Sequence, residues 1–403
     1  MPAGILGDAL LDAQLLRVMG SAPYGGADRG ECLAIAGRIQ GTDIDGWFTA
    51  WTGGADEATT LADVALARGD AETARAALFR ASNYHRNAGV MLLGSPVDPR
   101  LVASHARQTD AFRRAAALLE RPPELVEIPF EGASLPGYFF RAAGGGRRAT
   151  VILTGGYDGT AEELYFFNGA AALARGYHVL AFDGPGQGAA LLDRGLVMRP
   201  EWETVIAPVI DHLVARPYVD PARIALIGLS LGAHLGPRAA SAEHRLAACI
   251  ADCGSFDLHA SFLERLPGPL AGPFDRGNRI ARAVIGTILG RLARKPTAGW
   301  ALRRGMLVHG TPDVLSYVES LRAYSLAGRA ERIACPTWVC SAEGDDIGAS
   351  APRLVAALTV DSTYVRFTTA EGAGDHCEVG ARELYHARSF GWLDARLRPS
   401  EPA

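Results

Sequence analysis

One pentapeptide of this chain has the residue types and spacing of a nucleophilic serine: Gly228-Leu229-Ser230-Leu231-Gly232. An apolar run from Ile224 to Ile227 precedes it and an alanine-rich, helix-favouring segment follows it, so the pattern predicts a strand, a sharp turn and a helix. Such a turn brings backbone against backbone, and a Cβ atom two residues to either side of the serine would clash. We therefore predict that Ser230 stands at the end of a strand, where its hydroxyl can attack a carbonyl carbon.

A serine hydroxyl is a poor nucleophile at neutral pH unless a base takes its proton and a carboxylate orients the base. When the nucleophile lies on a strand–turn–helix element of this kind, the acid and then the base follow it in the chain. A carboxylate-bearing loop, residues 341–347, follows the apolar segment 338–340, and we assign the acid to Asp345, with Asp346 as the alternative. His376 is the only one of the ten histidines between this loop and the predicted terminal helix, so we assign it as the base.

An acyl-transfer reaction also needs backbone N–H donors for the oxyanion, each contributing roughly 3 to 4 kcal/mol. The N–H of Leu231, directly after the serine, is one predicted donor. The second should come from the glycine-rich segment 154–159, which follows an apolar strand. Gly156 is the first candidate within it, and Tyr157 is the second.

The elements that must hold these residues fall into four predicted regions. Residues 1–122 repeat apolar side chains at three- and four-residue spacing, which predicts a helical N-terminal domain. Residues 123–254 change to a strand pair and then alternating strands and helices, which predicts the first part of a doubly wound, mostly parallel α/β sheet. Residues 255–325 lose this alternation and should form a cap above the serine, and residues 326–403 complete the sheet.

Composition excludes several classes of protein. A formal net charge of −4 gives no electrostatic reason to expect binding to nucleic acid. Lys295 is the only lysine in the sequence, so no other position can supply a catalytic lysine. The six cysteines lack zinc-type spacing, and we expect reduced thiols and no metal. Residues 183–188 are rich in glycine but lack the G-x-G-x-x-G spacing of a dinucleotide-binding loop. We therefore expect this segment to form part of the wall of the active site, and we expect no cofactor. We see no leader sequence or membrane span, and we expect a cytoplasmic protein without membrane partners.

Four glycine-bearing motifs together resemble one branch of the α/β-hydrolases: residues 155–159, 182–188, 228–232 and 371–377. The branch contains 2,6-dihydroxypseudooxynicotine hydrolase and the fungal polyketide-shortening hydrolases of pigment biosynthesis. The resemblance extends over most of the chain, including a helical N-terminal domain and a Tyr-x-Arg element at Tyr84-His85-Arg86. The chain departs at Thr154, where many α/β-hydrolases have histidine.

The resemblance implies hydrolysis of a carbon–carbon bond beside a ketone, in an aryl ketone or a polyketide-like small molecule. The same residues would serve an esterase, a thioesterase or an acyl-transferring cyclase, and the sequence does not separate these activities. A catalytically silent, ligand-binding hydrolase fold is a further alternative. It would require a broken triad, whereas this one looks intact.

Specificity should lie outside the catalytic sheet, because many hydrolases share that sheet. We expect the helical domain and the cap to close over one water-excluding pocket. Tyr84 or Arg86 from the helical domain, with Phe262 and His309 from the cap, should line it. Two alternatives are that Tyr84 and Arg86 belong to an ordinary polar helix face, and that the helical domain is a dimerisation surface only. Apart from this choice, we expect the protein to form a homodimer.

Overall fold

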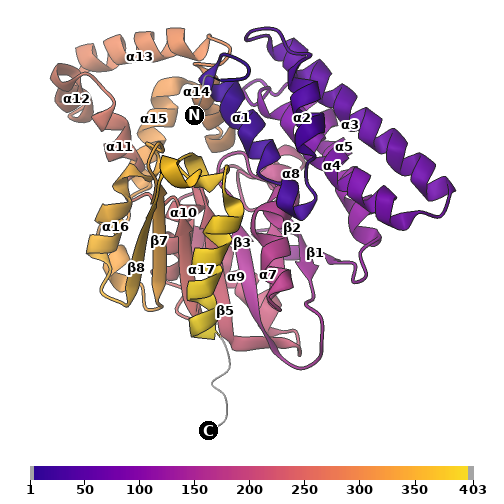
Figure 1. The fold of residues 1–403 in the computed structure, drawn as a ribbon. Helices are drawn as coiled ribbons and strands as arrows, with labels where there is room; N and C mark the ends of the chain where they lie inside the picture. Colours follow the sequence, from indigo (N-terminus) through magenta and orange to yellow (C-terminus); the bar gives the residue numbers. More distant parts are fainter. Residues whose placement is uncertain (1–3, 398–403) are drawn as a thin grey trace.

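The computed structural model describes residues 4–397, and its centre is one mixed sheet (Figure 1). Within that range the sheet has eight strands in the order β1-β2-β4-β3-β5-β6-β7-β8. Pairings β1–β2 and β2–β4 are antiparallel and the others are parallel, which confirms the predicted doubly wound, mostly parallel sheet. The strands are β1 (Glu124–Phe130), β2 (Ala133–Phe140), β3 (Arg148–Thr154), β4 (His178–Phe182), β5 (Val219–Leu229), β6 (Ala248–Asp252), β7 (Thr337–Ala342) and β8 (Ser362–Phe367).

The central strands are apolar throughout because both faces of the sheet are covered. On β3, Ile152 packs into one hydrophobic cluster with Trp202, while Val151 and Leu153 pack into another with Phe390 on the opposite face. The helices that connect or follow the strands of the sheet are α6 (Ala161–Leu164), α7 (Ala170–Ala174), α8 (Gly188–Leu192), α9 (Trp202–Val214), α10 (Gly232–Ala240), α16 (Ala351–Ala357) and α17 (Arg382–Leu397). The crossover between β3 and β4 is not one continuous α-helix, because a π turn, η2 (Tyr165–Gly169), separates α6 from α7.

The N-terminal region is helical, as predicted: α1 (Ala9–Met19), α2 (Arg29–Ala36), α3 (Ile44–Ala67), α4 (Ala71–Val90) and α5 (Pro99–Ala117). Gly69 follows α3 with a φ of +75°, and the Asp70 side chain accepts from the N–H of Thr73 at the start of α4, so that the two helices form a helix–turn–helix pair. Trp47 shares a hydrophobic cluster with Phe139 of the sheet. The helices therefore pack directly on the α/β core.

The inserted residues between β6 and β7 form a second group of helices: α11 (Leu258–Glu264), α12 (Gly268–Asp275), α13 (Arg279–Ala293), α14 (Trp300–His309) and α15 (Val314–Ser320). Both groups lie beyond the same end of the sheet (Figure 1). They also touch each other, because the indole N–H of Trp300 donates to the carbonyl of Val90 at 2.7 Å. The ends of the predicted domains, 1–3 and 398–403, lie outside the described residues, and the exact domain boundaries stay a prediction.

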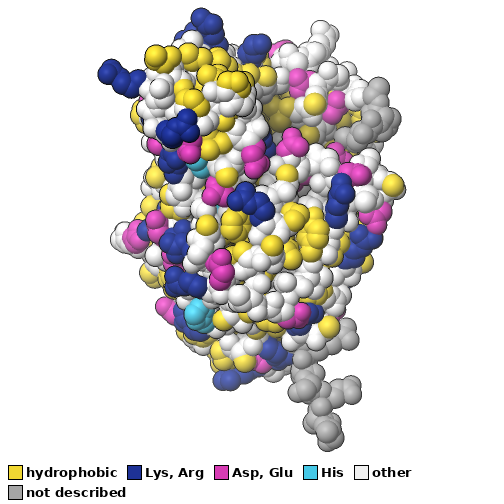
Figure 2. Space-filling model, turned by 90° about the vertical axis from the view of Figure 1, so that its left-hand side faces the viewer, with side chains coloured by type: hydrophobic (Ala, Val, Ile, Leu, Met, Phe, Trp, Pro, Cys, Tyr) yellow, Lys and Arg dark blue, Asp and Glu magenta, His cyan; other side chains and the backbone are white. Residues whose placement is uncertain are grey.

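The outer side of the cap exposes apolar side chains. On α13, Ile280, Val284 and Ile288 recur every four residues and all three are exposed. Figure 2 views the molecule from the left-hand side of Figure 1, and hydrophobic side chains gather on the upper part of that face. Homodimer formation stays a prediction.

Candidate active site

Ser230 lies on a tight turn between β5 and α10, as the pentapeptide predicts. Its φ of +61° is in the left-handed region, which a non-glycine residue occupies only where its surroundings hold it. Both flanking glycines are required, since a Cβ on Gly228 would lie 1.9 Å from the carbonyl oxygen of Gly232. A Cβ on Gly232 would lie 2.4 Å from the carbonyl oxygen of Thr154. The strained turn places the half-buried Ser230 side chain at the carboxyl end of the sheet.

The three residues assigned to the triad form one line of hydrogen bonds. Ser230 Oγ lies 2.9 Å from Nε2 of His376, and Nδ1 of His376 lies 2.8 Å from Oδ2 of Asp345. Asp345 is buried and its other oxygen accepts from the N–H of Ile347 at 2.9 Å, whereas Asp346 is exposed. The geometry therefore favours Asp345 over Asp346 as the residue that orients the imidazole.

Burial and charge shift the pKa values of this pair in opposite directions. Burial alone would lower the pKa of His376, but Cys377 and the Asp345 carboxylate raise it, so that it lies well above its ordinary value. Burial would raise the pKa of Asp345, and the neighbouring His376 outweighs this and keeps the pKa below its ordinary value. Asp345 is thus held as a carboxylate that can stabilise an imidazolium.

The predicted oxyanion loop faces the nucleophile. A Cβ on Gly156 would lie 2.8 Å from Cβ of Ser230 and 3.0 Å from its Oγ, so only glycine fits there without displacement. Within residues 4–397, the N–H groups of Leu231, Gly156 and Tyr157 donate no hydrogen bond. They are free to bind an oxyanion, and the choice between Gly156 and Tyr157 stays open. Thr154 is buried and accepts from the indole N–H of Trp202 at 3.2 Å.

Asp158 ties this loop to both groups of helices, a role that the sequence analysis missed. Arg17 on α1 lies 2.7 Å from it, Arg304 on α14 lies 3.2 Å away, and Arg86 on α4 lies 3.4 Å away. Burial would raise the pKa of Asp158, but the three guanidinium groups hold it well below its ordinary value. An acidic residue inside the glycine-rich segment 155–159 was the available signal in the sequence. Its arginine partners were too distant in sequence to find.

The two residues proposed from α4 have different surroundings. Arg86 is buried and borders, with Tyr157 and Asp158, a cavity of about 40 Å³. That volume suits about one water molecule, far below the roughly 300 Å³ of the smallest ligand pockets. Tyr84 lies in the interior of the helical region, where its hydroxyl donates to Glu31 at 2.8 Å. The structure does not bring Tyr84 to the site.

The two residues proposed from the cap also differ. Phe262 packs against Phe274 in the hydrophobic cluster of the cap, with ring centroids 5.9 Å apart. His309 instead contacts the oxyanion loop: its ring stacks on Tyr157 and its Nε2 lies 3.1 Å from the Tyr157 hydroxyl. His309 therefore supports the loop, and its contact with substrate stays a prediction.

A buried arginine holds the loop that carries His376, and sequence analysis did not identify it. Arg382 on α17 donates to the carbonyl of Cys377 at 2.7 Å and to Asp252 at 2.8 Å. The Arg382 side chain is fully buried. It contacts the loop where the backbone of Cys377 and Glu378 is left-handed, with φ values of +54° and +47°. This network fixes a strained backbone next to the imidazole.

A serine on a strained strand–helix turn, followed in the chain by its acid and base, defines a hydrolase of the α/β class. The model of the alpha/beta hydrolase family matches residues 150–385, and the chain belongs to that family. None of the helices within residues 4–397 combines the length and apolar character needed to cross a membrane.

Relatives over nearly the whole chain place it in the expected branch of fungal hydrolases. It is 36% identical to hydrolase LUC6 of Fusarium sp over 94% of this chain and 95% of that protein. It is 34% identical to the 20-hydroxy-prefusarin hydrolase FUS2 of Gibberella moniliformis over 95% of each. The crystal structure of 2,6-dihydroxy-pseudo-oxynicotine hydrolase has the same fold, with a TM-score of 0.75 at 24% identity over 94% of this chain and 95% of that one.

Proposed function

We propose that this protein is a serine hydrolase that cleaves a carbon–carbon bond beside a ketone in an aryl ketone or polyketide-like substrate. The observation that carries the proposal is the line of hydrogen bonds from Asp345 through His376 to Ser230. Free N–H groups at Leu231 and in the loop at Gly156 and Tyr157 lie beside it. Together they provide nucleophile, base and oxyanion stabilisation.

The reaction begins when Ser230 Oγ attacks the ketone carbon and its proton passes to Nε2 of His376. The carbonyl oxygen becomes an alkoxide held by the N–H of Leu231 and by one from the loop at Gly156 or Tyr157. Collapse of this intermediate breaks the carbon–carbon bond and leaves an acyl group on Ser230. The departing carbon takes the proton from His376, and water then hydrolyses the acyl-enzyme with His376 as the base.

The leaving group limits the substrate class. An unstabilised carbanion is too basic to be expelled, so the departing carbon must belong to an enolate or to an electron-rich aromatic ring. The four motifs resemble a branch that contains carbon–carbon hydrolases, which supports this class, although the same triad would also serve an esterase, a thioesterase or an acyl-transferring cyclase. The names of fungal relatives, one of them a 20-hydroxy-prefusarin hydrolase, are in keeping with a secondary-metabolite substrate.

Product analysis tests the proposal. Purified wild-type protein is incubated with matched series of 1,3-diketones, aryl ketones and aryl esters, and products are identified by mass spectrometry. We expect a carboxylic acid and a protonated carbon fragment from at least one ketone series, and no product with Ser230→Ala. Turnover of esters alone would remove the carbon–carbon assignment.

A second measurement tests the nucleophile without a known substrate. A fluorophosphonate probe should label wild-type protein at Ser230, and the label should be absent from Ser230→Ala of the same melting temperature. A folded wild-type protein that is not labelled would contradict the hydrolase assignment and favour a silent ligand-binding fold.

A further inference from the structure

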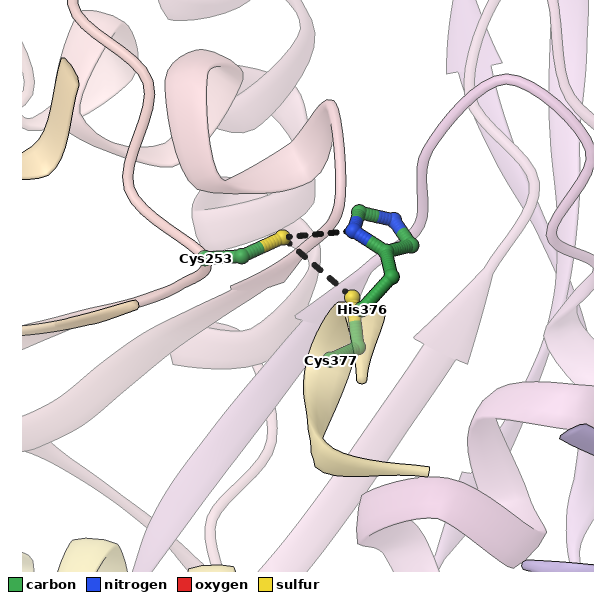
Figure 3. Close-up of side chains that lie close together, drawn as sticks. All are labelled: Cys253, His376 and Cys377. Atoms are coloured by element: carbon green, nitrogen blue, oxygen red, sulfur yellow. Dashed lines mark hydrogen bonds between the residues drawn. The ribbon is translucent and has the colours of Figure 1, made fainter. Parts of the chain in front are cut away.

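Two thiols lie behind the imidazole of the triad, on the side of Nδ1. Cys253 directly follows β6, and Cys377 directly follows His376 in η7 (His376–Glu378). The two sulfur atoms are 3.3 Å apart, and Sγ of Cys253 lies 3.5 Å from Nδ1 of His376 (Figure 3). Two cysteines separated by 124 positions in the chain thus meet beside one imidazole.

The backbone at both thiols is unusual. Cys253 has a φ of +57° and Cys377 a φ of +54°, and such residues cost of order 1–3 kcal/mol unless the surroundings impose them. A cysteine that only fills core space needs no such conformation, as Cys249 shows: it lies on β6 within a hydrophobic cluster. The conformation at Cys253 and Cys377 instead accompanies the convergence of both sulfurs on the imidazole.

We propose that Cys253, Cys377 and Nδ1 of His376 bind one thiophilic divalent cation, such as Zn²⁺, which switches hydrolysis off. All three ligand atoms lie within 4.8 Å of one another. Tetrahedral Zn²⁺ with its usual bond lengths separates a sulfur from a nitrogen by about 3.6 Å and two sulfurs by about 3.8 Å. The 3.5 Å from Sγ of Cys253 to Nδ1 already matches the first separation, and the two sulfurs, 3.3 Å apart, need an opening of about 0.5 Å.

Binding at this place inactivates the base. Each thiol releases its proton to solvent when its sulfur binds the cation. The proton on Nδ1 of His376 has to leave that nitrogen, and in the neutral ring it moves to Nε2. Protonated Nε2 cannot accept the Ser230 proton across their 2.9 Å contact. The cation is therefore an inhibitor and has no part in the proposed hydrolysis.

Direct binding is measured with Co²⁺, because thiolate-to-cobalt charge-transfer and tetrahedral d–d absorption bands report the ligands without any catalytic assay. Metal-free protein, kept reduced with a phosphine, is titrated as wild type, Cys253→Ser and Cys377→Ser. Cys335→Ser, a buried thiol in a core cluster away from the site, is the matched control. We expect one ion per chain for wild type and control, displaced by Zn²⁺, with affinity at least roughly tenfold weaker in each site variant.

Inhibition is measured as the rate at which a fluorophosphonate labels Ser230, relative to each variant's own metal-free rate. Zn²⁺ should slow labelling of the wild type and Cys335→Ser, and a chelator should restore it. Absence of the Co²⁺ bands, or bands that persist in both site variants, would overturn the site. A bound ion that leaves the labelling rate unchanged would overturn the inhibition. Because two single variants remove different ligands, the failure of one to fold leaves the other to decide.

Discussion

Replacing Asp345 by asparagine separates the orientation of the imidazole from all other contributions to the site. In the wild type Nδ1 of His376 donates to Oδ2 of Asp345 at 2.8 Å, and in the neutral ring this leaves Nε2 unprotonated and facing Ser230. An amide nitrogen at that position would donate to Nδ1, and the ring would then carry its proton on Nε2. The base would be held in the wrong tautomer.

The expected loss in kcat is about 10⁴-fold, or roughly 5.4 kcal/mol at about 1.36 kcal/mol per tenfold. Melting temperature should change little, because the isosteric side chain can keep the Ile347 contact. Asp346→Asn is the matched control, since Asp346 is exposed, and it should retain the wild-type rate. The assay is kcat on the best substrate of the ketone and ester series. A large loss in Asp346→Asn and a small one in Asp345→Asn would refute the assignment.

The pH dependence gives an independent check. Cys377 and the Asp345 carboxylate raise the pKa of His376 against burial, and the base must be neutral, so kcat/KM should fall as the pH drops through this raised pKa. Removing the carboxylate in Asp345→Asn should lower that pKa and move the acid limb to lower pH. An acid limb that does not move would show that the carboxylate has no electrostatic contact with the base.

Three more substitutions follow from the geometry. Gly156→Ala places a methyl 3.0 Å from Oγ of Ser230 and should lower kcat at least roughly 10²-fold with an unchanged fold by circular dichroism; full activity would mean that the loop lies elsewhere. Tyr84→Phe removes the hydrogen bond from the Tyr84 hydroxyl to Glu31, which stays partly exposed and paired with Arg80, and should cost roughly 0.5–1.5 kcal/mol of unfolding free energy in urea melts without changing KM; a KM effect without destabilisation would instead place Tyr84 in the pocket. Asp158→Asn removes the anion shared by the buried Arg86 and the half-buried Arg17 and Arg304, while Glu163 still pairs with Arg17 and Arg86. It should destabilise the protein by about 1–3 kcal/mol, with a larger loss of kcat than any distant buried substitution of equal cost; an unchanged melting temperature would contradict the clamp.

The sequence determined the features that depend on local geometry and chain order. Glycines two residues to either side of Ser230 encode the turn, because no other residue fits the close backbone contacts. Apolar runs of strand length encode the parallel sheet, and connection order places Asp345 and His376 after the serine, at the same end of the sheet. These signals lie in short stretches of sequence, so the fold class could be predicted, and so could the hydrogen-bonded residues Ser230, His376 and Asp345.

Tertiary packing decided what lies around that line. Tyr84 and Phe262 are aromatic residues of the kind that line ligand pockets. In the structure, however, each packs inside its own group of helices. The three arginines on Asp158 come from segments up to 146 residues away from it, and Cys253 meets Cys377 across 124 residues. No spacing rule connects such segments, because their distance is set by how whole helices pack on the sheet, and only the folded chain brings them together.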